Sequence, residues 1–290
     1  MSAVLLDGIA ISHQIREVAK KRVEALASNH NIRPGLAVIL VGDNPASRIY
    51  VRRKVHACGE LGIASAVHAF PSDVDTAQVI DLIERLNRDP ATHGILVQLP
   101  LPPPLEIQSI LRAIAIDKDV DGFHLYNVGG LVIGDTVFPP CTPYGVMKLL
   151  DTANIEVEGK NVTIVGASNL VGKPMALMML RREATVAICH AKTRDLAQYT
   201  ILADILVVAA GVPGLITARM VRSGAVVIDV GINRLANGRL VGDVDFEQVR
   251  HKASYITPVP GGVGPMTVTM LLENTIDAAE RASSELPASS

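Results

Sequence analysis

Residues 160–180, KNVTIVGASNLVGKPMALMML, hold the pattern that decides the fold. The apolar run 162–165 has the composition of a buried strand, Gly166 begins a turn, and an apolar helix follows Gly172. In α/β proteins a strand, a glycine turn and a helix hold the pyrophosphate of a nucleotide, because the helix N-terminus offers free N–H groups and a partial positive charge. The stretch predicts a dinucleotide site, with a plain strand-to-helix connection as the alternative.

Later strands of the same half end in further glycine turns. One is followed by Gly211, and another places Asp229, Gly231 and Ile232 at its end. Ligands of open parallel sheets bind at the carboxyl ends of the strands, so we expect these turns to line one site. The strands are expected at residues 162–165, 185–189, 205–209 and 226–230.

The residues that follow the strand 185–189 distinguish between the two nicotinamide cofactors. An NAD site usually has a carboxylate for the ribose 2′-OH about 20 residues past the glycines, whereas a basic residue suits a 2′-phosphate. Here Lys192 and Arg194 follow the strand, and the first carboxylate is Asp195. The pattern favours NADP, with ordinary solvated charges as the alternative.

The first half of the chain also alternates strands and helices. Short apolar runs predict buried strands and amphipathic stretches predict helices, so a second parallel sheet is expected. Residues 118–143 are rich in glycine and proline and are expected to be mostly loop. The strands are expected at residues 35–41, 64–70 and 94–98, and the helices at about 11–27, 47–61 and 76–86.

These segments together predict an α/β protein with two domains. We expect an N-terminal α/β substrate domain of residues 1–140, completed by a C-terminal helix in about 268–290. Residues 141–267 are expected to form the dinucleotide-binding domain. A chain that crosses twice between two domains is expected to leave a cleft between them.

One predicted helix of the first half carries an unusual set of polar side chains. Ser47, Tyr50, Lys54 and Cys58 are spaced so that they share one helix face. A lysine that reaches solvent over a half-buried tyrosine is the bland explanation. The helix follows the strand 35–41, however, and therefore begins at a strand's carboxyl end, where ligands bind.

Further residues are expected near this helix face. Gln98 and Pro100 stand at the carboxyl end of the strand 94–98, and Asp119 and Asp121 stand in the stretch KDVDGF. A buried lysine can transfer protons near neutral pH, and a glutamine carbonyl can orient it. A tyrosine face can stack on a flat heterocycle, and a carboxylate can accept two N–H bonds from an aminopyrimidine-like ring. We therefore expect one pocket that gathers a lysine, a tyrosine, a glutamine and an aspartate.

A loop rich in glycine and proline precedes the last predicted helix. Its sequence, ITPVPGGVGPMT, occupies residues 256–267 and contains Gly261 and Gly262. Such a loop is either a structural corner or a wall against which a ligand approaches the backbone. We expect the second.

The composition limits the class of protein. The 290 residues carry a net charge of −2 and are 49% hydrophobic, which argues against a disordered chain and against nucleic acid as a partner. The three cysteines form no C-x-x-C pair, the N-terminus lacks a basic signal region, and no apolar run approaches the ~20 residues of a membrane span. No residue cluster has metal-ligand spacing. We expect a cytoplasmic protein with neither a metal site nor a membrane partner.

The motifs, taken in order, closely resemble the bifunctional methylenetetrahydrofolate dehydrogenase/methenyltetrahydrofolate cyclohydrolase family. The resemblance implies oxidation of 5,10-methylenetetrahydrofolate to 5,10-methenyltetrahydrofolate with NADP, and then hydrolysis to 10-formyltetrahydrofolate. It also implies a Rossmann-like NADP-binding domain, a homodimer, and an active site in the cleft between the domains. The matching segments, which run in family order across nearly the whole chain, are DNPASRIYVRRK, GILVQLPLP, KDVDGFHLYNVG, PCTPYG, IVGASNLVGKPMA, GAVVIDVGIN and ITPVPGGVGPMT.

The resemblance also assigns roles to residues. It implies that Lys54 is the catalytic lysine, that Tyr50 stacks on the folate, that Gln98 supports the lysine and that Asp121 holds the pterin ring. The substrate is expected to be bordered by Gly261 and Gly262. We add Ser47 and Pro100 as substrate contacts, because they stand near Tyr50 and Gln98 in the sequence. Cofactor contacts are expected at Gly166, Ala167, Ser168 and Ile232, to which the patterns above add Gly172, Lys192 and Gly211.

Among the positions that depart from the family pattern, two concern the cofactor. Many relatives carry arginine where Ala167 stands and serine where Ala191 stands, and those side chains help to grip the 2′-phosphate. Lys192 and Arg194 are the candidates to replace them. Two other functions stay open: a different nicotinamide enzyme of the shikimate or amino-acid type, and a non-catalytic protein that senses nucleotides.

Overall fold

The computed structural model describes residues 2–284, and contacts divide the chain into two compact units. The three-stranded unit comprises residues 14–141 and the chain from Val268 onward. The six-stranded unit comprises the N-terminal residues up to His13 together with residues 142–267. Residues 285–290 of the expected substrate domain lie outside the described residues. In the range 2–284, no helix is long and apolar enough to cross a membrane.

The division by contacts differs from the expected one at the N-terminal residues. β1 (Val4–Leu5) pairs in parallel with β11 (Tyr255–Ile256), and the backbone N–H of Leu6 donates to the carbonyl oxygen of Ile256. These bonds between backbone groups far apart in the sequence place the first residues in the six-stranded unit. α1 (Gly8–His30) therefore has its first residues in one unit and the rest in the other.

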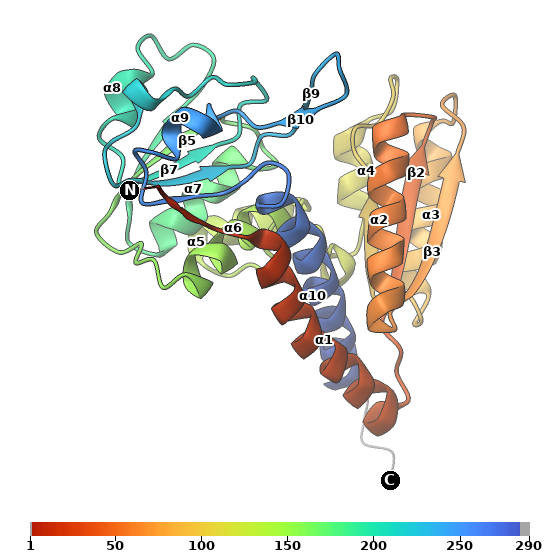
Figure 1. Cartoon of the computed structure of the whole chain (residues 1–290). Helices are drawn as coiled ribbons and strands as arrows, with labels where there is room; N and C mark the ends of the chain where they lie inside the picture. Colours follow the sequence, from red (N-terminus) through yellow and green to blue (C-terminus); the bar gives the residue numbers. More distant parts are fainter. Residues whose placement is uncertain (1, 285–290) are drawn as a thin grey trace. The chain divides into compact units, whose positions relative to one another are not determined.

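The sheet of the three-stranded unit is parallel, in the order β3-β2-β4. The central strand, β2 (Gly35–Val41), is buried at every residue, and it pairs with β3 (Ala64–Phe70) and β4 (Gly94–Val97). Such a strand belongs to a sheet that is covered on both faces. The helices are α2 (Pro45–Leu61), α3 (Thr76–Arg88), α4 (Ile107–Ala113), η1 (Ile116–Lys118) and α5 (Leu125–Ile133), with most of α1 and of α10 (Val263–Ser284) (Figure 1).

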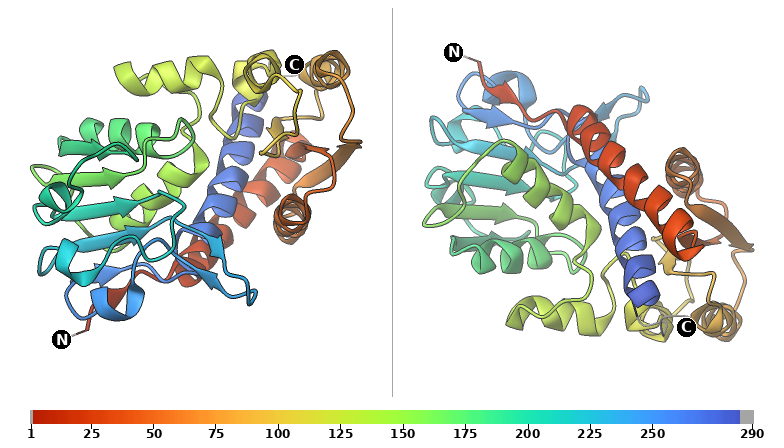
Figure 2. Two further views of the ribbon diagram at one scale, coloured as in Figure 1. Left: turned by 90° about the horizontal axis from the view of Figure 1, so that it is seen from above. Right: turned by 90° about the horizontal axis from the view of Figure 1, so that it is seen from below.

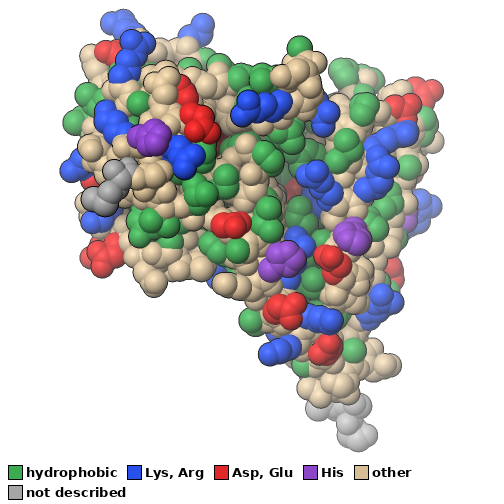
Figure 3. Space-filling view, in the orientation of Figure 1, with side chains coloured by type: hydrophobic (Ala, Val, Ile, Leu, Met, Phe, Trp, Pro, Cys, Tyr) green, Lys and Arg blue, Asp and Glu red, His purple; other side chains and the backbone are tan. Residues whose placement is uncertain are grey.

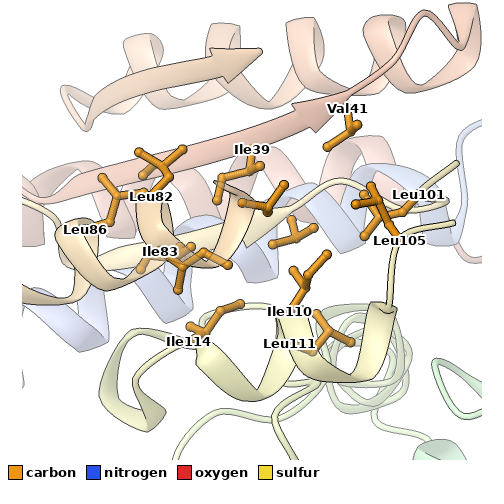
Figure 4. Packing of buried hydrophobic residues seen from close by; sticks show 14 of the residues in the cluster. Ile39, Val41, Leu82, Ile83, Leu86, Leu101, Leu105, Ile110, Leu111 and Ile114 are labelled. Atoms are coloured by element: carbon orange, nitrogen blue, oxygen red, sulfur yellow. The ribbon is translucent and has the colours of Figure 1, made fainter. Parts of the chain in front are cut away.

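A cluster of apolar side chains lies between this sheet and two helices. Ile39 of β2 faces Leu82 and Ile83 of α3 in Figure 4, and Ile110 of α4 lies in the same cluster. Ile39, Ile83 and Ile110 are fully buried. Each buried side chain of this size contributes about 1.5–3 kcal/mol, so the cluster holds the strands rigidly and fixes where their carboxyl ends lie.

The sheet of the six-stranded unit is also parallel, in the order β1-β11-β8-β7-β5-β6. Its other strands are β5 (Asn161–Val165), β6 (Thr185–Cys189), β7 (Ile205–Val208) and β8 (Val226–Asp229), which run side by side in both views of Figure 2. The chain passes from β5 to β6 on one side and then to β7 on the other. The strand order therefore reverses at β5, and ligands of open α/β sheets bind at such a reversal.

The six-stranded unit has short helices and one small hairpin. The hairpin joins β9 (Asn233–Arg234) to β10 (Leu240–Val241) directly after the end of β8. The hairpin strands are antiparallel, unlike those of the sheet. The helices are α6 (Cys141–Thr152), α7 (Gly172–Arg181), α8 (Ala197–Thr200), η2 (Ala218–Met220) and α9 (Phe246–Val249), with the first turn of α10.

Residues 118–143 contain more regular structure than their composition predicts. α5 forms there although Gly129 and Gly130 lower helix propensity. Close packing explains it, because a Cβ atom at Gly130 would lie 2.4 Å from the carbonyl oxygen of Asp135. The chain just past the end of α5 thus approaches Gly130 too closely for a side chain at this position.

Candidate active site

Clear start and stop signals place α2 directly after β2. The Asn44 side chain accepts hydrogen bonds from the backbone N–H groups of Ala46 at 2.9 Å and Ser47 at 3.2 Å, and Pro45 occupies the first helical position. Gly62 ends the helix in the left-handed conformation, with φ of 79°. The N-terminal half of α2 therefore stands at the carboxyl edge of the sheet.

The two faces of α2 differ sharply in chemistry. Ser47, Lys54 and Cys58 are buried, and Lys54 is only 9% exposed, while Tyr50 is partly exposed. So little exposure argues against a lysine that merely extends into solvent over Tyr50. The opposite face is basic, and Figure 3 shows Lys and Arg side chains over α2, whose exposed arginines are Arg48, Arg52 and Arg53.

Lys54 meets the first residue after β4. Its Nζ atom donates a hydrogen bond of 3.2 Å to Oε1 of Gln98. The other end of that amide is also bound, since Nε2 of Gln98 donates to the carbonyl oxygen of Leu99 at 2.7 Å. The backbone N–H of Gln98 extends the sheet by donating to the carbonyl oxygen of Ile39 at 2.9 Å. The glutamine is thus fixed with its oxygen toward the lysine.

Asp121 belongs to the same electrostatic group. Burial raises the pKa of the Asp121 carboxyl, while the positive charge of Lys54 and a hydrogen bond from the Cys141 thiol lower this pKa. The Cys141 thiol is itself buried and also donates to the carbonyl oxygen of Val120 at 3.3 Å. Sequence reasoning used Cys141 only as a sign of the redox compartment and missed its place beside Asp121. The motif PCTPYG was the signal that could have found it.

Asp119 fastens the loop that carries Asp121. Its side chain is 1% exposed and accepts hydrogen bonds from the backbone N–H groups of Phe123 and His124 and from Nδ2 of Asn127. Burial raises the pKa of Asp119 to about 7, although these three bonds favour the charged form. Sequence reasoning noted Asp119 without a role, and it did not find Asn127.

Glycines shape the nucleotide turn at the point where the strand order reverses. Gly166 follows β5 with φ of 121°, and a Cβ atom there would lie 2.1 Å from the carbonyl oxygen of Ala209. A Cβ atom at Gly172 would lie 1.8 Å from the carbonyl oxygen of Gly166. The backbone after β5 therefore packs tightly against the residues after β7 and against the start of α7. Glycine is required at both positions.

Ser168 occupies the inside of this turn. Its Oγ accepts hydrogen bonds from the backbone N–H groups of Val171 at 3.1 Å and Gly172 at 3.4 Å. Ala167, beside it, offers no side-chain donor. Lys173 in the first turn of α7 donates through Nζ to Oδ1 of Asn169 at 2.7 Å. The turn thus presents backbone and a hydroxyl, which suits the close approach of a pyrophosphate.

The other predicted cofactor residues lie at neighbouring strand ends. Gly211 follows β7 with φ of 68°, and a Cβ atom there would meet nothing within 4 Å, so that side of the turn is open. Ile232 follows β8 and is 45% exposed. Lys192 and Arg194 are exposed in the loop after β6. Four neighbouring strands of one sheet thus deliver these residues to one edge, which fits an elongated dinucleotide.

The predicted substrate residues are divided between the two units. Pro100 belongs to the three-stranded unit and is exposed. It stands close to Gln98 in the sequence. Gly261 and Gly262 belong to the six-stranded unit. Gly261 has φ of 110°, and a Cβ atom at Gly262 would lie 2.7 Å from the carbonyl oxygen of Pro258. Across residues 2–284, no group of three or more His, Cys, Asp or Glu side chains could hold a metal ion.

Two family models match the chain, one for each kind of domain. The model described as tetrahydrofolate dehydrogenase/cyclohydrolase, catalytic domain, matches residues 6–121. The model described as tetrahydrofolate dehydrogenase/cyclohydrolase, NAD(P)-binding domain, matches residues 140–283. The first range contains the Lys54 and Gln98 pair, and the second contains the glycine turn after β5.

Individual proteins agree with these models along nearly the whole chain. The bifunctional protein FolD of Nitrosospira multiformis is 59% identical over 99% of this chain and 99% of its own. The crystal structure of the bifunctional methylenetetrahydrofolate dehydrogenase/cyclohydrolase FolD of Campylobacter jejuni is 54% identical over 97% of this chain and 99% of its own, with a TM-score of 0.95. The corresponding enzyme of Trypanosoma brucei, solved with NADP and an inhibitor, is 39% identical over 97% of this chain and 98% of its own, with a TM-score of 0.94. The chain belongs to the tetrahydrofolate dehydrogenase/cyclohydrolase family.

Proposed function

We propose that the protein oxidises 5,10-methylenetetrahydrofolate to 5,10-methenyltetrahydrofolate with NADP and then hydrolyses the product to 10-formyltetrahydrofolate. The observation that carries this proposal is the hydrogen bond between Lys54 and Gln98 beside Asp121, in the range that matches the family's catalytic domain. A buried amine whose position is fixed by a neutral amide is suited to proton transfer. Membership of the family argues against the shikimate-type and purely sensing alternatives.

The NADP site is formed at the carboxyl ends of the strands of the six-stranded sheet. Gly166 and Gly172 let the backbone approach the pyrophosphate, and Ser168, Gly211 and Ile232 lie beside it. Ala167 adds no charge, so Lys192 and Arg194 hold the 2′-phosphate. When bound, the nicotinamide accepts a hydride from the one-carbon bridge of the folate. The protein contributes to this step by holding the two reactants close together.

The folate is held by side chains of the three-stranded unit. The Asp121 carboxylate accepts N–H bonds from the pterin ring, and the Tyr50 ring stacks on the folate. Ser47 and Pro100 line the substrate near Tyr50. Gly261 and Gly262, which carry no side chains, border the substrate with backbone.

The hydrolysis needs proton transfers that Lys54 performs. Water adds to the carbon of the methenyl bridge, and Nζ of Lys54 takes the proton that this water releases. The bond from this carbon to N5 of the folate then breaks as the new hydroxyl becomes the formyl C=O, and the proton that the hydroxyl gives up balances the proton that N5 receives, while the formyl group stays on N10. Gln98 holds the amine in place through its Oε1 atom.

The test is a steady-state assay of the purified protein with methylenetetrahydrofolate and either NADP or NAD. We expect NADPH and 10-formyltetrahydrofolate to form in equal amounts, with NADP preferred over NAD. NADP binding without turnover would support the sensing alternative instead. Turnover of shikimate or an amino acid, and not of the folate, would support the other dehydrogenase.

We further propose that the enzyme is a homodimer that works in the cytoplasm. β6 is an edge strand of the six-stranded sheet, and an open edge is a template for pairing with another chain. Apolar side chains in the region of this edge are exposed, among them Leu180, Ile188 and Leu202. Sedimentation should give twice the chain mass of 30.8 kDa, and Ile188→Glu should give the monomer. The free, buried Cys58, Cys141 and Cys189 suit a reducing compartment.

A further inference from the structure

Two aspartates that the reaction above does not use lie buried beneath the cofactor edge of the six-stranded sheet. Asp229 is the last residue of β8 and is 3% exposed, and Asp243 follows the β9–β10 hairpin and is fully buried. Buried carboxylates are rare unless they are well bonded, and each of these has at least three hydrogen-bond donors. Four of their six donors, Ala210, Gly211, Gly231 and Asn233, come from the loops that carry Gly211 and Ile232.

Asp243 binds the turn after β7 and the start of the hairpin at the same time. Its Oδ2 atom accepts hydrogen bonds from the backbone N–H groups of Ala210 at 2.7 Å and Gly211 at 2.8 Å. Its Oδ1 atom accepts a hydrogen bond of 2.8 Å from Nδ2 of Asn233. One carboxylate thus ties the end of β7 to the residue that follows Ile232.

Asp229 in turn holds Asp243 and the other neighbour of Ile232. Its Oδ1 atom accepts from the backbone N–H groups of Gly231 and Asp243, each at 3.0 Å. Its Oδ2 atom accepts from the backbone N–H of Val244 at 2.9 Å. Ile232 is therefore flanked by Gly231, bound to one aspartate, and by Asn233, bound to the other.

Glycines leave the room that these carboxylates need. A Cβ atom at Gly231 would lie 2.3 Å from the carboxyl carbon of Asp243. A Cβ atom at Gly242 would lie 1.9 Å from an oxygen of Asp229. The two glycines and the two aspartates therefore form one interlocked unit, which accounts for the glycine in the motif DVGIN.

We propose that Asp243 is a positioning residue for the nicotinamide cofactor, acting through Gly211 and Ile232, whose backbone geometry it fixes at the ends of β7 and β8. The inference rests on the proposed function, because it assumes that these two residues contact NADP. Asp243 has no exposed surface and acts only through other residues. Asp229 supports it by binding its backbone N–H and the adjoining Val244.

The test compares three variants with the wild-type enzyme. Asp243→Ala removes all three acceptor contacts, Asp243→Asn keeps the shape and one oxygen, and Asn233→Ala removes only the bond to Oδ1. Asp245→Asn is the matched control, because Asp245 is partly exposed and its side chain accepts only from Gln248 at the start of α9. The measurements are KM and Kd for NADP, kcat, the melting temperature, and hydrolysis of methenyltetrahydrofolate without cofactor.

We expect Asp243→Ala to raise KM and Kd for NADP by about tenfold or more, since buried bonds to a charged acceptor are lost. Asn233→Ala should raise both values less, and Asp243→Asn should recover part of the loss. In all three variants hydrolysis without cofactor should stay near the wild-type rate. Asp245→Asn should match the wild type in every measurement.

A folded Asp243→Ala enzyme with an unchanged Kd for NADP would overturn the inference. If that variant does not fold, Asp243→Asn and Asn233→Ala decide, and loss of both activities in step with the melting temperature would assign these residues to stability alone. Failure of the proposed function itself would look different. The wild-type enzyme would then neither reduce NADP nor hydrolyse methenyltetrahydrofolate.

Discussion

Nζ of Lys54 lies 3.2 Å from Oε1 of Gln98, and the amide nitrogen of that glutamine is bound to the carbonyl oxygen of Leu99. The contact joins a helix that follows one strand to the first residue after the neighbouring strand. Because both strands are parallel and buried, the two side chains meet at the carboxyl edge of the sheet. Gln98 is uncharged, so it holds the amine without adding a second carboxylate to that of Asp121.

Gln98→Glu should slow the hydrolysis by about tenfold or more, because a carboxylate would favour the charged ammonium and disfavour its loss of a proton. The carboxylate would also lose the donor that binds the Leu99 carbonyl. Gln108→Glu makes the same change at an exposed position of α4 and should have no effect. The rate of methenyltetrahydrofolate hydrolysis measures the difference, and an unchanged rate in Gln98→Glu would remove this glutamine from the proton transfer.

Stability should depend on pH through Asp119. Its pKa is raised from 3.8 to about 7 in the folded protein, so the folded state binds a proton that the unfolded state releases. The contribution of Asp119 to the free energy of unfolding should therefore be fully present below pH 4, fall by up to about 1.4 kcal/mol per pH unit as the pH rises toward 7, and be lost above it.

The variant Asp119→Asn should lose this part of the slope, as measured by denaturant unfolding at several pH values between 4 and 7. Asp117→Asn, which alters an exposed carboxylate of η1, should keep the wild-type slope. A slope that is identical in wild type and Asp119→Asn would show that Asp119 does not titrate in this range.

Lys192→Ala should raise KM for NADP far more than KM for NAD, because only NADP carries the 2′-phosphate that this side chain is proposed to hold. Lys160→Ala serves as the control, since Lys160 precedes β5 at the opposite end of the strand. The measurement is the ratio of kcat/KM for the two cofactors. Equal changes for both cofactors would leave Arg194 as the candidate.

Gly172→Ala should weaken NADP binding and destabilise the six-stranded unit, because its Cβ atom would lie 1.8 Å from the carbonyl oxygen of Gly166. Gly59→Ala is the matched helical control, since a Cβ atom there meets nothing within 4 Å, and it should stabilise by about 0.5–1 kcal/mol. Melting temperatures and NADP titrations check both. A Gly172→Ala enzyme with wild-type affinity would mean that the turn adjusts freely.

Local patterns predicted the strands well and the tertiary contacts poorly. The run GLAVILV gave β2 its bounds, because a strand buried on both faces is apolar throughout. The pairing of β1 with β11 joins segments at opposite ends of the chain, which no local pattern contains. The helix α5 was not predicted because its two glycines have low helix propensity, although the contact of Gly130 is with the nearby Asp135.

The same distinction applies to the site. Lys54 and Gln98 could be placed near each other because each follows a predicted parallel strand. Cys141, whose thiol hydrogen-bonds to Asp121, and Asp243, whose carboxylate binds Gly211, belong to distant segments. Only the folded chain shows which loops these buried groups hold.

The central claim is that the enzyme performs both steps and that Lys54 catalyses the hydrolysis. The most direct test is a time course of NADPH, methenyltetrahydrofolate and 10-formyltetrahydrofolate with the wild-type and Lys54→Met enzymes. Arg53→Met, on the exposed face of α2, is the control and should match the wild type. We expect the wild type to form NADPH and 10-formyltetrahydrofolate together, and Lys54→Met to remain folded without enzymatic hydrolysis. Hydrolysis at the wild-type rate in Lys54→Met would contradict the account.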